Sequence, residues 1–204
     1  MNKPANAAAL GYGVFALILW LTSMAPAGWF DPPSGNLRML LLVAGLGGCV
    51  LAIAGIMQWI RGHALDALLF LAFAGYWWIH ALAPHPLTVG AAAPASSGFL
   101  GWYYAAWALL GLCACMAAWR RDSARTLFSL GLWLSLFAYA LAHWLRFDAL
   151  LVLGGYLGLV TAVVAIYIAA ATLINEVHAN AVLPLGEADR NGQPAASGTT
   201  PPQR

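Results

Sequence analysis

Long apolar runs separated by short polar or turn-rich segments make up most of the chain. Six such runs can be delimited, at residues 7–24, 39–60, 65–83, 99–119, 126–145 and 149–174. Each is near the ~20 residues that an α-helix needs to cross a hydrocarbon core of ~30 Å. In lipid, a helix bonds all its backbone polar groups within the segment, which makes it the natural spanning element. The pattern predicts an all-α integral membrane protein with six transmembrane helices.

The segments between the runs are typical of turns and tails. Asp31-Pro32-Pro33-Ser34-Gly35-Asn36 follows the first run, and an uncharged stretch of Gly, Ala, Pro and Ser occupies residues 90–98. We expect one six-span domain over residues 1–187 and a disordered polar tail over residues 188–204. The first run also has an alternative interpretation as a signal peptide, but it is longer than the usual ~7–15-residue apolar core.

Composition excludes a soluble domain and narrows the class of partner. The chain is 62% hydrophobic and 8% charged, whereas soluble domains are about 45–50% apolar and about 25% charged. The net charge is +2, and the basic residues form no stripe, so no nucleic-acid partner is expected. The 3 cysteines have no metal-ligand spacing, so neither a metal nor a disulfide framework is expected.

The basic residues predict the orientation in the bilayer, because short cytoplasmic loops collect Lys and Arg. In a six-span arrangement, 7 of the 9 basic residues fall on the side of the termini. These are Lys3, Arg61, Arg120, Arg121, Arg125, Arg190 and Arg204, against Arg38 and Arg146 on the other side. We therefore expect a multi-pass protein of a cell (inner) membrane with both termini cytoplasmic and residues 90–98 external.

Candidate chemistry is sparse, since no ionisable residue falls in the middle of a predicted span. We interpret Asp66, in the first turn of the third span, as a complement to the helix dipole. His80 and His143 lie near the outer ends of spans, where an interfacial role is favoured over haem ligation or a quinone site. Residues alone thus indicate a conduit for a small solute, with no catalytic residue, no metal and no cofactor.

Small residues at four-residue spacing point to close helix packing. They form one stripe in the second run and another in the sixth, namely Ala44, Gly48 and Ala52, and Gly154 and Gly158. The stripes are expected to pack against helices of the same chain or, for at least one of them, against a neighbouring protomer.

The end of the sixth run carries the most specific motif in the chain. Residues 175–187 read Asn-Glu-Val-His-Ala-Asn-Ala-Val-Leu-Pro-Leu-Gly-Glu, which resembles the end of the acetate uptake transporters, the YaaH/SatP-type succinate-acetate permeases. Residues 70–77 and the start, Asn6-Ala7-Ala8-Ala9-Leu10-Gly11-Tyr12, are similar to further family motifs. Two prolines of the family's start are alanine here, and Asn6 is still able to cap the first helix.

The resemblance implies a homo-hexamer in which each protomer's six helices enclose a narrow central pathway through the lipid bilayer. Its constriction would be formed by Phe15, Phe73 and Leu134, with Phe73 in place of the family's usual Tyr. Tyr76 would supply a hydroxyl only after a shift of register. Thr172 replaces a common Glu, and Asn6, Leu10, Gly11, Asn175 and Glu176 are possible solute contacts or motif residues.

The function that follows is transport of acetate or a similar short carboxylate, by a channel or a proton-coupled permease, and not an enzyme activity. A non-transporting membrane scaffold or sensor that keeps the family fold is the alternative, and a membrane enzyme comes third. The three constriction residues also have a plain alternative interpretation as helix-packing residues.

Overall fold

The computed structural model describes residues 6–29, 34–82, 95–119, 122–178 and 180–186. Six helices occupy this part of the chain: α1 Ala7–Met24, α2 Ser34–Ile60, α3 Ala64–Leu82, α4 Ser97–Ala118, α5 Ser123–Leu145 and α6 Asp148–His178. All six are long and apolar enough to cross a membrane. The prediction of a six-helix membrane protein is confirmed. The expected tail at residues 188–204 and most of the expected external loop lie outside the described residues.

Local sequence accounts for where several helices begin and end. Asn6 caps α1, because its side chain accepts a hydrogen bond from the Ala8 backbone N–H at 3.0 Å. Asp122 caps α5 in the same way through the Arg125 N–H at 2.9 Å. Gly62 has a φ of 79° in the short turn between α2 and α3, a conformation that suits glycine. These caps are the reason that the apolar runs become discrete helices.

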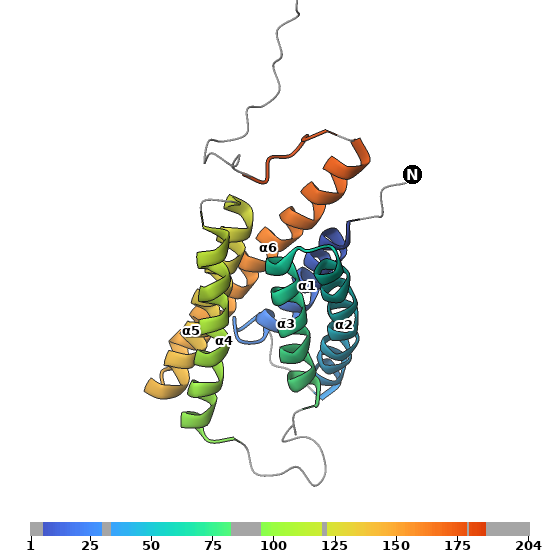
Figure 1. Cartoon of the computed structure of the whole chain (residues 1–204). Coiled ribbons are helices and arrows are strands. Elements are labelled where there is room, and N and C mark those ends of the chain that lie inside the picture. Colours follow the sequence, from blue (N-terminus) through green and yellow to red (C-terminus); the bar gives the residue numbers. More distant parts are fainter. Residues whose placement is uncertain (1–5, 30–33, 83–94, 120–121, 179, 187–204) are drawn as a thin grey trace, which may run out of the picture.

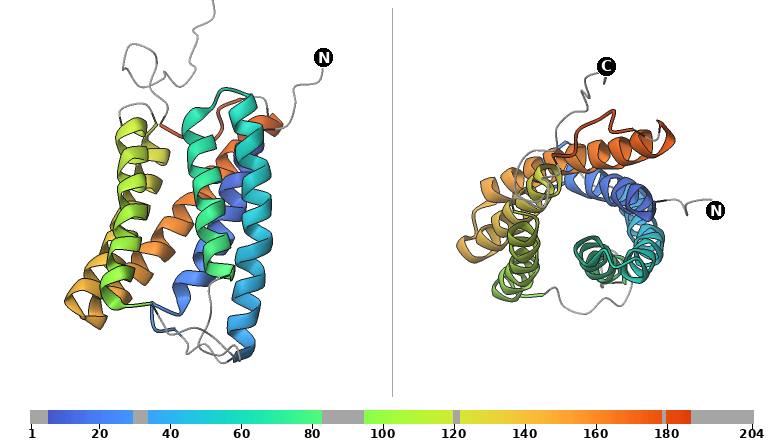
Figure 2. Two further views of the ribbon diagram at one scale, coloured as in Figure 1. Left: turned by 60° about the horizontal axis from the view of Figure 1, so that its bottom comes forward. Right: turned by 45° about the horizontal axis from the view of Figure 1, so that its top comes forward.

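The helices form an open arc in the order α3, α2, α1, α6, α5 and α4 (Figure 2). Consecutive members of this arc pack against each other, whereas α3 and α4, at its two ends, touch each other only sparsely. Helices that follow each other along the chain run in opposite directions (Figure 1). One end of the arc therefore holds Asn6 and Gly62, and we call it the Asn6 end. The opposite end holds the turn at Arg146, and we call it the Arg146 end.

Both small-residue stripes are used inside the protomer. A Cβ on Gly48 would lie 2.8 Å from the Trp78 ring and 3.2 Å from the Ala74 carbonyl oxygen of α3. A Cβ on Gly154 would lie 3.2 Å from the Ser135 carbonyl oxygen of α5, and one on Gly158 would meet the Ser23 side chain of α1. Of the two alternatives, the structure therefore favours packing within the chain, because helices of the same chain lie against the glycines of both stripes.

Candidate functional site

Three phenylalanine rings from different helices meet inside the arc. Phe15 of α1, Phe73 of α3 and Phe128 of α5 each expose 0% of their surface. The Phe15 ring centroid lies 5.2 Å from that of Phe73 and 5.1 Å from that of Phe128, distances at which tilted and edge-on ring pairs are attractive. We call these three residues the aromatic cluster. It fills the interior of the protomer between its two ends.

A cavity of about 130 Å³ opens on the Arg146 side of the aromatic cluster, and Phe73 forms part of its wall. This volume exceeds that of several waters, so an acid with four non-hydrogen atoms fits. Its lining is apolar with hydroxyl groups interspersed, and the polar members are Thr22, Ser23, Tyr76, His80, Tyr104, Ser135 and Tyr139. Within the described part of the chain, no Lys, Arg, Asp or Glu lines the cavity. It therefore suits a small solute that carries both polar and apolar surface.

One hydrogen-bond donor in the cavity wall has no acceptor among the described residues. Trp77 lines the cavity with 2% of its surface exposed, and its indole Nε1 is buried without a partner. Its neighbour Trp78, by contrast, donates to the Gly45 carbonyl oxygen at 3.2 Å. A buried donor without a protein partner requires an explanation, and a water or a solute held in the cavity would supply the acceptor.

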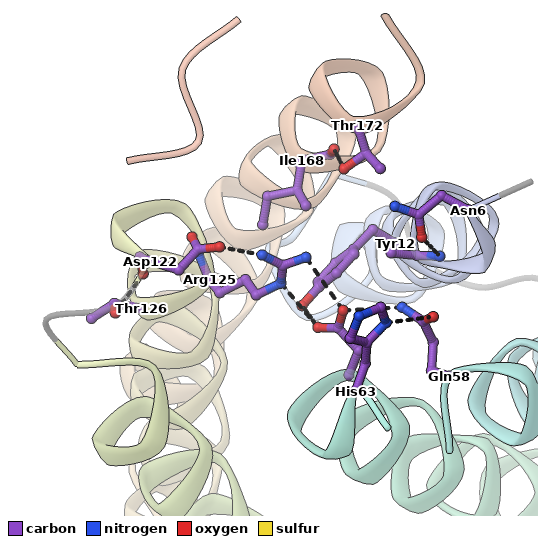
Figure 3. Close-up of polar contacts among 11 residues, drawn as sticks. Asn6, Tyr12, Gln58, His63, Asp122, Arg125, Thr126, Ile168 and Thr172 are labelled. Atoms are coloured by element: carbon purple, nitrogen blue, oxygen red, sulfur yellow. Dashed lines mark hydrogen bonds and ion pairs between the residues drawn. The ribbon is translucent and has the colours of Figure 1, made fainter. Parts of the chain in front are cut away.

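A buried ionic network lies on the opposite, Asn6 side of the cluster (Figure 3). Asp66 Oδ1 accepts hydrogen bonds from the Tyr12 hydroxyl at 2.8 Å and from Arg125 Nε at 3.0 Å. Asp66 Oδ2 accepts from Gln58 Nε2 at 3.1 Å and from Arg125 Nη2 at 3.3 Å. Arg125 also pairs with Asp122. We call these five residues the inner network; it joins α1, α2, α3 and α5.

Asp66 thus does more than complement the dipole of α3, as the sequence had suggested. Its surface is only 4% exposed, and a carboxylate at that depth is stable only with a paired charge and hydrogen bonds. The network supplies both.

A known protein family matches most of the chain. The chain matches the GPR1/FUN34/yaaH family over residues 1–187. It belongs to this family. The resemblance to the YaaH/SatP-type permeases is confirmed.

Relatives of this chain within the family are named as transport proteins. The succinate-acetate/proton symporter SatP of Escherichia coli strain K12 is 26% identical over 192 residues, covering 91% of this chain and 97% of SatP. The Shigella flexneri protein of the same name has the same identity and coverage. The solved structure of the bacterial acetate channel SatP superposes with a TM-score of 0.82 at 22% identity, covering 90% of this chain and all of that one. The fold is therefore that of the channel.

The family motif after the sixth span has a structural role in this member. The Asn175 side chain donates to the Leu183 carbonyl oxygen and accepts from the Leu183 N–H, both at 2.8 Å. The segment then reaches the start of α5, where the Leu185 and Gly186 carbonyls accept from the Ala124 and Ser123 N–H groups. These are first-turn N–H groups that lack partners within the helix. Asn175 therefore anchors the chain end on α5, away from the cavity.

The other motif residues also serve packing and capping. The Glu176 carboxylate accepts from the Asn6 N–H at 3.1 Å, which ties the end of α6 to the start of α1. Gly11 is buried where a Cβ would meet the Phe70 ring, whereas Leu10 is 47% exposed. Thr172 donates to the Ile168 carbonyl oxygen within α6 at 2.7 Å. None of these five residues lines the cavity.

The structure brings Phe15 and Phe73 together but places Leu134 elsewhere. Leu134 is 36% exposed, while Leu132 and Leu136, two positions away on either side, are buried and line the cavity. A helix turns about 200° over two residues, so a register that points Leu132 inward points Leu134 outward. The member of α5 that meets Phe15 is Phe128. In the aromatic cluster, Phe128 therefore takes the position that the sequence had assigned to Leu134.

Tyr76 reaches the cavity without any shift of register. Its ring centroid lies 5.6 Å from that of Phe73, and both residues line the cavity. The hydroxyl that Phe73 lacks is therefore present one turn away.

Sequence reasoning missed Phe128 and the inner network, although signals for both exist. Phe128, Leu132 and Leu136 recur every four residues and so mark one face of α5. Spans three and five begin on the same side of the membrane, and each carries one charge in its first turn, Asp66 and Arg125. Opposite charges at the same depth were a cue for pairing.

Proposed function

We propose that this protein carries acetate or a similar short carboxylate across a cell membrane, as a channel or a proton-coupled permease. The observation that carries the proposal is the cavity whose wall includes Phe73, because it places a solute-sized space directly against the aromatic cluster. The names of the SatP relatives supply the class of solute.

The cavity offers groups suited to a carboxyl and to a short alkyl tail. The Trp77 N–H and the hydroxyls of Tyr76 and Tyr104 are candidate donors to the carboxyl oxygens. Leu132 and Leu136 provide the apolar wall against which a methyl group would pack. No Lys or Arg is among the described residues that line this wall, so we propose that the solute enters the cluster as the neutral acid.

The aromatic cluster is the proposed constriction. Its rings must part for a solute to pass from the cavity toward the Asn6 end, because all three are fully buried in the closed arrangement. Phe15 and Phe73 keep the role proposed for them from the sequence, and Phe128 takes the place proposed for Leu134.

We further propose that the Asn6 end faces the cytoplasm of a cell with an inner membrane and that six protomers assemble in the bilayer. The excess of basic residues on the side of the termini supports the orientation. Family membership supports the assembly. Native mass spectrometry in mild detergent tests the hexamer, and a monomer at all protein concentrations would contradict it.

Uptake by liposomes that contain the purified protein tests the function. We expect labelled acetate to enter these liposomes faster than it enters protein-free liposomes of the same lipid. Propionate and succinate define the size limit. A correctly assembled oligomer that takes up none of the three acids would instead support the scaffold or sensor.

A further inference from the structure

The inner network has an unbalanced charge. Two carboxylates, Asp66 and Asp122, share the guanidinium of Arg125, so the site carries one net negative charge when all three are ionised. The two carboxylate residues are 4% and 6% exposed. The Arg125 side chain is 17% exposed, so the guanidinium is within reach of water at the Asn6 end.

Among the described residues, Arg125 is the one cation that pairs with Asp66. Tyr12 of α1 and Gln58 of α2 are neutral donors to its carboxylate, and the His63 ring lies 3.3 Å from Gln58 Oε1, on the far side of that amide. Ile168 and Thr172 of α6 are drawn near the network in Figure 3, and neither carries a charge. A negative buried site repels a carboxylate anion, so it accepts one only if a proton arrives with it.

A continuous series of ring contacts joins the network to the aromatic cluster. The Tyr12 ring centroid lies 5.3 Å from that of Phe128, which in turn contacts Phe15. The hydroxyl of the same Tyr12 donates to Asp66. A solute that passes the cluster toward the Asn6 end therefore next meets the Tyr12 hydroxyl and the Asp66 carboxylate.

We propose that Asp66 and Arg125 form a carboxylate exchange site, in which a short neutral acid gives its proton to Asp66 and takes the place of Asp66 on Arg125. This inference rests on the proposed function. The O–H bond of the solute breaks, an O–H bond forms on an Asp66 oxygen, and the electron pair stays on the solute carboxylate. The net charge of the site is one negative before and after the exchange, so no uncompensated charge is created in the protein interior.

The geometry supports both states of the exchange. Asp66 contacts Arg125 through Nε and Nη2, the parallel arrangement by which a guanidinium binds any carboxylate. Protonated Asp66 would need a hydrogen-bond acceptor, and the Tyr12 hydroxyl oxygen lies 2.8 Å from Asp66 Oδ1. The carboxylate of Asp66 therefore occupies the position that a solute carboxylate would take.

Titration calorimetry of acetate binding to the purified full-length oligomer tests the exchange through its proton balance. Repeating the titration in buffers of different ionisation enthalpy gives the number of protons taken up for each acetate bound. We expect about one proton per acetate for the wild type, because an anion must bring a proton to Asp66. Binding without proton uptake in the wild type would overturn the proposal, whatever the variants do.

The Asp66→Asn variant separates the exchange from a purely structural ion pair. It keeps the shape of the side chain and an oxygen that accepts from the Tyr12 hydroxyl, but it puts an NH2 group opposite Gln58 and removes the proton acceptor and one negative charge. Acetate should then bind without proton uptake and about tenfold to a hundredfold more tightly at pH 8, since the variant removes one of the two carboxylates that compete with acetate for Arg125. Uptake should slow and lose its dependence on pH, because the bound anion has no route to leave as an acid.

The Asp148→Asn variant is the matched control, since Asp148 is an exposed acid at the start of α6 at the other end of the molecule. Its proton balance and uptake should equal those of the wild type. If Asp66→Asn behaves like this control, the proposal is wrong. If the wild type binds acetate with a proton but takes up no acid into liposomes, the exchange site stands and the transport function falls.

Discussion

At the scale of single residues, Phe73 is where the aromatic cluster and the cavity meet, and its size should set the barrier. Phe73→Ala removes a ring that contacts Phe15 and Trp107. We expect faster uptake and admission of larger acids, together with a loss of about 3–5 kcal/mol of folding stability. Uptake of acetate, propionate and succinate, measured on variant protein shown to be assembled, checks this. Leu134→Ala is the control at a half-exposed position, and equal effects of the two substitutions would contradict the assignment.

Trp77 gives a second prediction, which concerns the affinity for the solute and not the size of the solute that can pass. Trp77→Phe keeps an aromatic ring in the cavity wall and removes only the N–H that has no protein acceptor. We expect the acetate concentration at half-maximal uptake to rise about fivefold to tenfold, the value of one hydrogen bond of about 1–1.5 kcal/mol. Trp78→Phe is the control, since its N–H is already bonded to Gly45. No change on substituting Trp77 would place the solute elsewhere.

The sequence predicted some residues of the site and missed others, because some depend on a motif within one span and others depend on how different spans face each other. Phe15 and Phe73 were found together because motifs in two spans fixed their registers. Leu134 was placed on the wrong face, because none of the quoted motifs lies in span five, and a difference of two residues turns a helical side chain through about 200°. The burial of Asp66 depended on the arc, which places the start of α5 across its interior from the start of α3, and on the Arg125 side chain that reaches Asp66 from there. Neither is visible in a single span.

At the scale of helices, apolar length located each span but did not fix its last turns. The second helix begins at Ser34 and the sixth ends at His178, five residues and four residues beyond the apolar limits predicted at 39 and 174. Polar residues continue these helices because a helix that leaves the hydrocarbon core still satisfies its own backbone. Which helices are neighbours depends on side-chain packing between them, so the sequence alone gave the number of spans but not the arc.

Glycine at helix crossings gives a prediction about the packing of α5 against α6. A Cβ on Gly154 would lie 2.6 Å from the Tyr139 ring and 3.2 Å from a backbone oxygen. We expect Gly154→Ala to destabilise the protein by about 1–3 kcal/mol through overpacking. Gly75→Ala in α3, where a Cβ meets nothing within 4 Å, should be neutral or slightly stabilising. Thermal unfolding in detergent compares the two, and equal midpoints would contradict the packing.

At the scale of the whole molecule, polar groups lie on both sides of the aromatic cluster, which forms an apolar layer in the middle of the protomer. The cavity on the Arg146 side holds hydroxyls and an indole N–H, the aromatic cluster holds none, and the inner network holds the ion pairs found among the described residues. The arc brings these three layers into line because α1, α3 and α5 each contribute to all of them. This alignment is a property of the fold and does not belong to any one motif.

The order of these layers makes a prediction about the chemical form of the solute. Between the cavity and the inner network a solute meets only the aromatic cluster, where an unpaired carboxylate would lose several kcal/mol or more of hydration. The neutral acid avoids most of that cost, and above the ordinary carboxyl pKa near ~4 its fraction falls about tenfold with each pH unit. At a fixed total concentration of acetate, uptake should therefore rise steeply as the external pH is lowered from about 8 to about 5, the range over which a short carboxylic acid approaches its titration. A second series, in which total acetate is adjusted to hold the neutral acid constant, should give nearly equal rates across the same range. The Phe73→Tyr variant should weaken this dependence, since a hydroxyl in the cluster offers the anion a donor that the native phenylalanine lacks. Rates that follow total acetate at every pH would mean that the anion itself crosses the aromatic cluster, and that the cluster opens far enough to admit water with it.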